Sequence, residues 1–106
     1  MAKSRLRYVN GQLYVSMDFA GRIILPEKVF SFQGYRVVHE GSEIHILQDQ
    51  YTAVPANRRI TIQSYIRNKL NLDAECVFRV EKTDDRIILT KVDPATIEGI
   101  EGGEAE

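Results

Sequence analysis

The chain has 106 residues, of which 43% are apolar and 27% are charged, as in an ordinary soluble globular protein. It contains no run of 18 apolar residues and no signal-peptide core, so we expect neither a membrane span nor a secretory leader. Its single cysteine, Cys76, cannot pair within the chain, and a reducing cytoplasm is the expected location.

The net charge of −1 is unevenly distributed along the chain. Residues 93–106 contain five acids and no base, whereas residues 1–92 contain 14 basic and 10 acidic residues, a net charge of +4. A mildly basic body permits nucleic-acid binding without requiring it. The acidic, glycine-containing segment 93–106 predicts a disordered tail.

Residues 1–12 predict a basic N-terminal arm. Lys3, Arg5 and Arg7 stand at every second position, so an extended chain would point all three to one side. Such an arm either keeps the protein in solution or contacts the phosphates of a nucleic acid.

Residues 13–50 predict a first structural unit, which begins with two strands. The segment 13–21 is typical of a strand that runs into a turn closed by Gly21. The apolar segment 22–25 is typical of a short strand.

The rest of this unit predicts helical turns and a hairpin. Pro26 stops the preceding strand and suits the first position of a helix, and Gly34 could cap the other end, so we expect one or two weak helical turns over 26–34. Residues 35–48 alternate between apolar and polar, which predicts a hairpin with its turn at 40–42.

Residues 51–92 predict a second unit with the same plan. A strand, a turn at 55–57 and another strand lead to a short helix. Ser64 is a good N-cap for that helix, and Ile66 would face inward. Asn71 can end the helix in a left-handed conformation.

The last predicted element of the second unit is a hairpin. Cys76, Phe78 and Val80 stand at alternate positions, as on the buried face of a strand. Asp84 and Asp85 predict its turn.

The order of elements suggests an internal repeat. Arg22-Ile23 aligns with Arg59-Ile60 at an offset of 37, and 42–48 aligns with 85–91 at an offset of 43. A unit of this size is marginal alone, but two units can bury their apolar faces by closing into a small β-barrel. We therefore expect a mainly β fold with short helices, closed within one chain or by swapping in a homodimer or larger homo-oligomer.

The sequences "DFAGRIILP" (18–26) and "RRITIQSYIRNKLNLDAECVFRVEKTDDRIILTKV" (58–92) resemble the AbrB family of swapped-hairpin DNA-binding regulators. The tandem arrangement is similar to MraZ, a relative with two such units. The resemblance covers roughly residues 13–92. It implies a cytoplasmic, nucleoid-associated transcriptional regulator that binds double-stranded DNA.

The resemblance also implies a set of DNA-facing residues. Arg22 and Arg59 match the arginine that follows the family's loop, and Arg67 matches an arginine on its short helix. The second copy departs from the pattern, with Arg58 at the position of the loop glycine. The expected DNA-binding set is Lys3, Arg5, Arg7, Arg22, Arg58, Arg59, Arg67 and Lys69.

No pattern in the sequence predicts an enzyme, a metal site or a cofactor. His39 and His45 stand on or beside predicted strands near acids, where half-exposed histidines are the simpler interpretation. Cys76 stands among core-facing residues and is expected to be a buried hydrophobe. The aromatic residues, Tyr51 and Tyr65 among them, are expected to pack in the core.

Two other functional classes stay open. The chain could be an antitoxin-type or other protein-interaction module that binds a partner through its acidic tail, where Ile97 and Ile100 stand among acids. It could also be an assembly protein that uses the barrel only to oligomerise.

Overall fold

A computed structural model describes residues 5–31, 33–50, 52–54, 57–73 and 76–97 of the chain. The fold is mainly β, as the sequence predicts, with one short α-helix and one 3₁₀ helix among the described residues. The elements in chain order are β1 (Arg5–Val9), β2 (Gln12–Ser16), β3 (Arg22–Ile24), β4 (Gly34–Glu40), β5 (Glu43–Gln48), β6 (Thr52–Ala53), β7 (Arg59–Thr61), α1 (Ser64–Lys69), β8 (Val77–Lys82), β9 (Arg86–Val92) and η1 (Pro94–Thr96).

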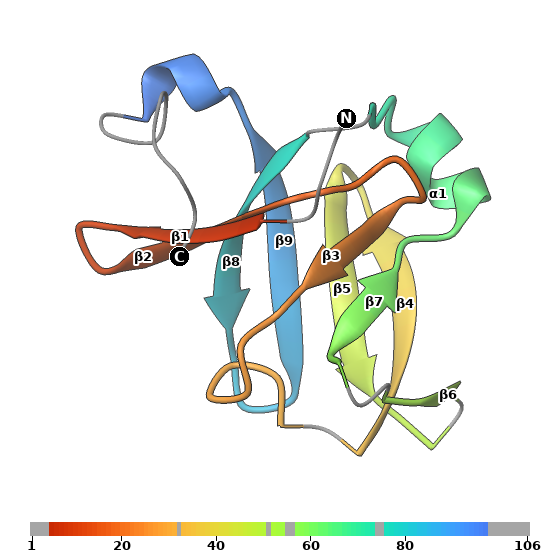
Figure 1. Ribbon diagram of the computed structural model, residues 1–106. Helices are drawn as coiled ribbons and strands as arrows, with labels where there is room; N and C mark the ends of the chain where they lie inside the picture. The colour runs from red at the N-terminus through yellow and green to blue at the C-terminus, as the bar shows by residue number, and fades with distance from the viewer. Residues whose placement is uncertain (1–4, 32, 51, 55–56, 74–75, 98–106) are drawn as a thin grey trace.

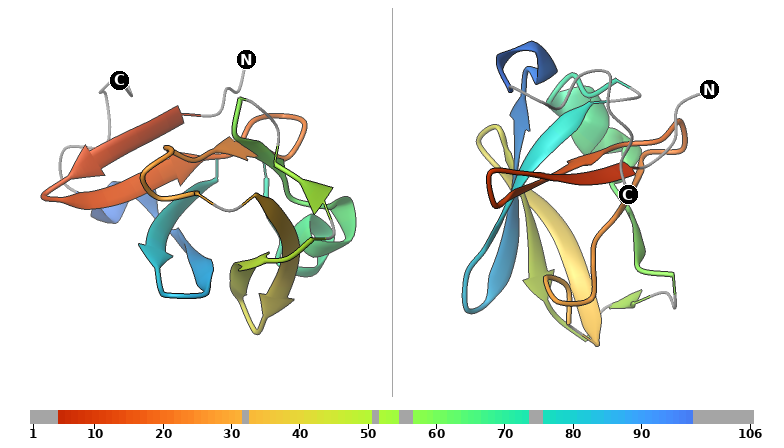
Figure 2. Two further views of the ribbon diagram at one scale, coloured as in Figure 1. Left: turned by 90° about the horizontal axis from the view of Figure 1, so that it is seen from below. Right: turned by 60° about the vertical axis from the view of Figure 1, so that its left-hand side comes forward.

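Seven strands form a curved sheet in the order β1-β2-β8-β9-β5-β4-β6, and β3 and β7 form a separate two-stranded ribbon (Figure 1). The ribbon lies across the open side of the curved sheet (Figure 2). Within the described ranges no strand pairing joins β1 to β6, so the predicted closed barrel is not found there. The hydrogen bonding is instead that of an open sheet with a ribbon packed over it.

One hydrophobic core fills the space between the ribbon and the sheet. Ile23 and Ile60 point inward from the ribbon and are fully buried. The inner face of the sheet contributes alternate residues of its strands, as expected for a sheet with one buried face. The fully buried sheet residues are Val15, Ile44, Ile46, Phe78, Ile87 and Leu89.

The strand registers follow the internal repeat. In the ribbon, Ile23 pairs with Ile60, its equivalent at the offset of 37. In the sheet, His45 of β5 pairs with Ile88 of β9, its equivalent at the offset of 43. Because each of these antiparallel pairs joins equivalent residues, the two halves of the chain are related by a local two-fold axis through both pairs.

The first strand of each half pairs with the hairpin of the other half. Val15 of β2 pairs with Phe78 of β8, and the equivalent Thr52 of β6 pairs with Tyr35 of β4. The described residues therefore exchange strands within one chain. The ranges 13–50 and 51–92, expected as two units, share one core and one sheet.

The N-terminal segment differs from the expected arm. Residues 5–9 form β1, which pairs with β2 through a two-residue turn at Asn10 and Gly11. Both turn residues have positive φ, 52° and 82°, as a type I′ hairpin turn requires. Because this turn joins β1 and β2 into a hairpin, the basic residues from Arg5 onward belong to the sheet.

Of the one or two helical turns predicted over 26–34, one is present, at residues 26–30. Val29 and Phe30 both donate their backbone N–H groups to Pro26 O, which makes a single turn. Phe30 then enters the core, and its ring packs edge-on against Tyr35 with centroids 5.8 Å apart. The first copy is about six residues shorter here, so Gly34 must already begin β4 to pair with Ala53.

In the second half, α1 is a regular helix with an unexpected start. Gln63, not Ser64, occupies the N-cap position, and its side chain makes no capping hydrogen bond. Ile66 is fully buried, as predicted. Asn71 has φ +56° and follows the last helical turn, which confirms the predicted left-handed end.

The predicted hairpins and the predicted burial of Cys76 are confirmed, whereas residues 55 and 56 of the predicted turn lie outside the described residues. Both long hairpins form, with turns at 41–42 and 83–85, and Cys76 is buried. Of the expected tail, residues 94–96 form η1, while 98–106 lie outside the described residues, as does Tyr51. No helix in the described part of the chain has the length and apolar content to cross a membrane.

Candidate nucleic-acid interface

The outward face of the β3–β7 ribbon brings together two of the predicted arginines. Because Ile23 and Ile60 point inward, the alternate residues Arg22 and Arg59 point outward. Arg22 pairs with Thr61 in the register, and Arg59 stands two positions before Thr61, so the two arginines are diagonal neighbours. Diagonal residues of this kind lie about 7–8 Å apart. The local two-fold axis exchanges them.

At one end of the ribbon, the loop 18–22 is closed on itself. The buried Asp18 carboxylate accepts hydrogen bonds from Arg22 N at 2.9 Å and Arg22 Nε at 3.1 Å. Gly21 N donates to Asp18 O, and Asp18 N donates to Arg22 O, both at 3.0 Å. Burial raises the pKa of the Asp18 carboxyl, but the hydrogen bonds and the charge of Arg22 outweigh burial and hold this pKa below its usual value.

Helix α1 lies beside the loop 18–22 (Figure 1), and the side chain of its Arg67 lies against Gly21 of this loop. A Cβ atom built at Gly21 would come within 2.6 Å of Arg67 Nε, so a larger residue would require the guanidinium to shift. Gly21 also has φ +79°, which disfavours other residues. Arg67 Nε donates to Ile62 O at 2.9 Å. We call the loop 18–22 together with α1 the α1 end of the ribbon.

The other end of the ribbon joins residues 57–59 to the turn 26–30, and we call it the turn end. Arg58 has φ +56°, the left-handed conformation of its equivalent Gly21. Its Nη1 donates to Phe30 O at 2.6 Å, and its Nη2 lies 3.6 Å from Glu27 Oε2. Arg58 therefore joins two loops, which the sequence did not indicate.

Arg59 is less constrained than its neighbour Arg58. Its backbone N–H donates to Asn57 Oδ1 at 3.0 Å. Its Nε is shielded from water and has no hydrogen-bond partner among the described residues. Lys28 adds a further cation at this end, with its Nζ 4.7 Å from the centre of the Tyr8 ring. A guanidinium on the outward face of the ribbon is suited to bind an anion through its planar fork of donors.

The other predicted residues are not gathered on the ribbon. Lys69 is exposed in α1. Arg7 alternates with Leu6, which packs against the core, so Arg7 lies on the sheet face that points away from the core and the ribbon. Lys3 and the side chain of Arg5 lie outside the described residues. The structure thus groups Arg22, Arg58, Arg59 and Arg67 and separates Arg7 from them.

Two exposed aromatic residues near the arginines were not expected as surface features. Phe19, in the closed loop of the α1 end, is 62% exposed, and Tyr65 of α1 is 58% exposed. The expectation that Tyr65 packs in the core is therefore wrong. The polar residues around Tyr65 in "QSYIRNK" are the sequence signal for its exposure. So short a helix has one buried position, and Ile66 occupies it.

We expected both histidines to be half-exposed, and His45 is not. His45 is buried on the face of the sheet opposite to the core, and its Nε2 lies 3.1 Å from Glu43 Oε1. Its Nδ1 lies 3.2 Å from Arg86 Nη1. Because a guanidinium can only donate, Nδ1 accepts and Nε2 carries the proton to Glu43. His45 is thus part of a structural hydrogen-bond chain.

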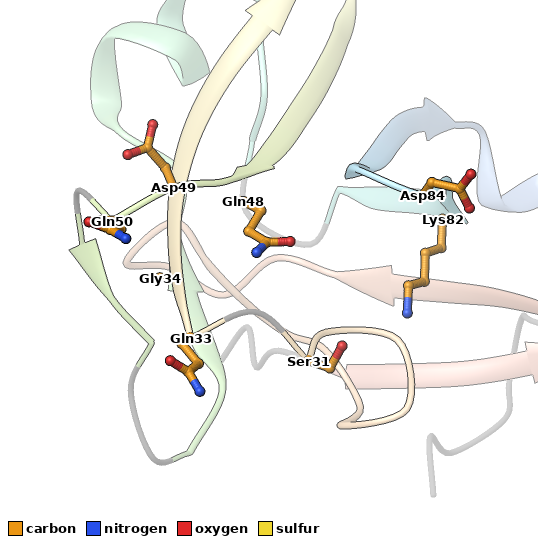
Figure 3. Close-up of a pocket in the computed structure, with 8 residues that line it drawn as sticks. All are labelled: Ser31, Gln33, Gly34, Gln48, Asp49, Gln50, Lys82 and Asp84. Atoms are coloured by element: carbon orange, nitrogen blue, oxygen red, sulfur yellow. The ribbon is translucent and has the colours of Figure 1, made fainter.

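Figure 3 shows the residues that line a polar hollow of about 620 Å³. It opens between the start of β4 and the tip of the β8–β9 hairpin, and none of the predicted DNA-binding residues lines it. Its lining is Ser31, Gln33, Gly34, Gln48, Asp49, Gln50, Lys82 and Asp84. With mixed charges, amide groups and no apolar wall among these residues, it lacks the character of a small-molecule site.

Comparisons of the chain with protein-family models, with curated proteins and with solved structures give no match. The resemblance to the AbrB family and to MraZ therefore stays a prediction.

Proposed function

We propose that this protein binds double-stranded DNA through the outward face of the β3–β7 ribbon and regulates transcription in the cytoplasm, in association with the nucleoid. The observation that carries the proposal is the placement of Arg22 and Arg59 on that face at positions exchanged by the local two-fold axis. The major groove is about 12 Å wide and admits a two-stranded β-ribbon. Two arginines about 7–8 Å apart can reach phosphates or guanine edges within it.

The flanking loops support the same use of this face. Each end of the ribbon contributes cations, Arg67 and Lys69 at the α1 end and Lys28 and Arg58 at the turn end. The nearby acids are engaged, since Asp18 is held by Arg22 and Glu27 lies beside Arg58. The phosphate contacts would supply most of the affinity, and the arginines together with DNA shape would supply sequence preference.

The exchange of strands within one chain supports a monomer as the DNA-binding unit, because one chain already holds both two-fold-related arginines. A homodimer or larger homo-oligomer stays a prediction, to be tested by the mass of the protein in solution. It would use a surface other than the exchanged strands.

The proposal is tested by selection from a pool of labelled genomic duplexes in the presence of competitor DNA. We expect a sequence subset to be retained by the wild-type protein and lost by the Arg22→Ala, Arg59→Ala double variant. Binding without any sequence enrichment would reduce the function to non-specific DNA binding, and no binding at low salt would overturn it.

A further inference from the structure

Phe19 occupies the tip of a rigid turn. Gly21 N donates to Asp18 O, so Phe19 and Ala20 are the two central residues of a β-turn. The Asp18 carboxylate fixes the base of this turn through its two hydrogen bonds from Arg22. The backbone that carries the side chain at position 19 is therefore fixed relative to Arg22 and the ribbon.

The fold does not require an aromatic residue at this tip. Phe19 is 62% exposed, so it contributes little to the core. At the offset of 37, the equivalent residue of the second half is Ala56. An aromatic residue therefore stands at this position in the first half of the chain and not at the equivalent position of the second.

Two cations lie at the base of the turn that carries this apolar side chain. Arg22 follows it in the turn, and the Arg67 guanidinium lies against Gly21. An apolar group next to cations is complementary to an apolar base edge next to phosphates. In the major groove that apolar group is the C5 methyl of thymine, for which phenylalanine is a suitable contact.

We propose that Phe19 contacts a thymine methyl group at one end of the DNA site. This inference rests on the proposed function, because it requires the ribbon to face DNA. The arginines on the ribbon are two-fold related, whereas the sequence places a phenylalanine at position 19 of the α1 end and the much smaller Ala56 at the equivalent position of the turn end. The protein therefore binds its site in one direction, with thymine recognised at the half that faces α1.

The test compares thymine with uracil, which lacks only the methyl group. Short randomised duplexes are enriched on the wild-type protein, and the enriched pool is copied with either thymidine or deoxyuridine nucleotides. The affinity of each protein for the two pools is then measured. Wild type should prefer the thymine pool, and Phe19→Ala should reduce that preference by about fourfold, the factor expected for burying one methyl group.

Two control variants separate this contact from general binding. Arg59→Ala should bind both pools more weakly but keep the preference for thymine. Tyr65→Ala, which removes a similarly exposed aromatic ring from α1, should also keep it. The Phe19 variant should unfold at the wild-type urea concentration, because the residue is exposed.

The possible failures are distinguishable. If wild type enriches no duplex, the proposed function fails and this inference fails with it. If wild type enriches duplexes but Phe19→Ala keeps the full thymine preference, the ribbon binds DNA and the assignment of Phe19 is overturned. Equal losses for both pools in Phe19→Ala would also overturn it, because the lost contact would not involve the methyl group.

Discussion

The two ends of the β3–β7 ribbon have equivalent backbone hydrogen bonds but carry different side chains. Ile62 N donates to Gly21 O at the α1 end, and the equivalent Leu25 N donates to Arg58 O at the turn end. Gly21 and Arg58 both have positive φ, 79° and 56°. The equivalent residues Phe30 and Arg67, however, are a buried core residue at the turn end and a partly exposed cation at the α1 end.

This difference shows what two similar halves within one chain allow and a homodimer does not: equivalent positions can have different roles. In a homodimer both copies of a position must be core or both must be surface. Within one chain each position is free to specialise, so the turn end adds to the core through Phe30 while the α1 end retains a helix with Arg67 and Lys69. The two-fold symmetry survives in the backbone and in Arg22 and Arg59.

The largest effect should come from Phe30→Ala. Because this ring is fully buried and packs against Tyr35, its loss should destabilise the protein by about 3–5 kcal/mol. Urea denaturation measures the change, with Phe30→Leu as a milder control that keeps most of the volume. Arg67→Ala, at the equivalent position, should lose far less stability. Comparable losses in the two variants would contradict the division of roles.

The next effect concerns DNA affinity. Arg59→Ala should weaken duplex binding by about 5- to 150-fold, because an arginine contact to a phosphate or a guanine edge accounts for about 1–3 kcal/mol. Fluorescence anisotropy with the enriched duplex measures it. Arg36→Ala is the matched control, since Arg36 is exposed on the sheet face that points away from the ribbon. Equal losses in both variants would mean that the charge of the whole protein, and not the ribbon, determines binding.

Gly21→Ala tests the contact between the closed loop and α1. The left-handed conformation alone should cost about 1–2 kcal/mol. Gly11→Ala carries the same backbone penalty at φ +82° but meets no atom within 4 Å. The Gly21 variant should therefore lose more stability than the Gly11 variant, and it should also lose DNA affinity because Arg67 is displaced. If the Gly21 and Gly11 variants lose the same stability and the same DNA affinity, Arg67 does not belong to the DNA-binding site.

A smaller effect should depend on pH. Because the pKa of Asp18 is lower in the folded protein than in the unfolded chain, its contribution to stability is complete above about pH 4 and is lost as the pH falls through the folded-state pKa. The urea midpoint of wild type should therefore fall more steeply with acidification than that of Asp18→Asn. Parallel curves for the two proteins would show that the carboxylate does not stabilise the loop.

The smallest effect should follow removal of residues 98–106. This segment contains four glutamates and no base, so its deletion should raise DNA affinity slightly at low salt by removing charge that repels phosphates. Anisotropy titrations at low and high salt measure the difference, which should vanish at high salt. A loss of affinity on deletion would instead assign the tail a positive role in binding.

The sequence predicts the hairpins, the repeat and the core positions, because alternation and turn residues act locally. It also contained the Asn10-Gly11 turn, which marks a hairpin strongly when apolar residues flank it. Over 26–34 the prediction holds for one turn only: Pro26 favours a helical turn locally, but Gly34 already pairs with Ala53 of the other half. The role of Phe30 depends on that same long-range pairing.

The candidate site could be predicted only in part for a similar reason. Arg22 and Arg59 follow from the strand pattern and the resemblance. The contact of Arg58 with Phe30 O joins residues 28 positions apart, and the contact between Arg67 and Gly21 joins the two halves. Neither has a local sequence signature. The exposure of Phe19 likewise depends on how the loop closes around Asp18.

The salt dependence of duplex binding, compared between wild type and the Arg22→Ala, Arg59→Ala double variant, tests the central claim most directly. We predict that the logarithm of wild-type affinity falls linearly with the logarithm of salt concentration, and that the double variant has a slope shallower by about two, one for each lost phosphate contact. Wild type and variant lines with equal slopes would contradict the claim that the ribbon arginines bind DNA.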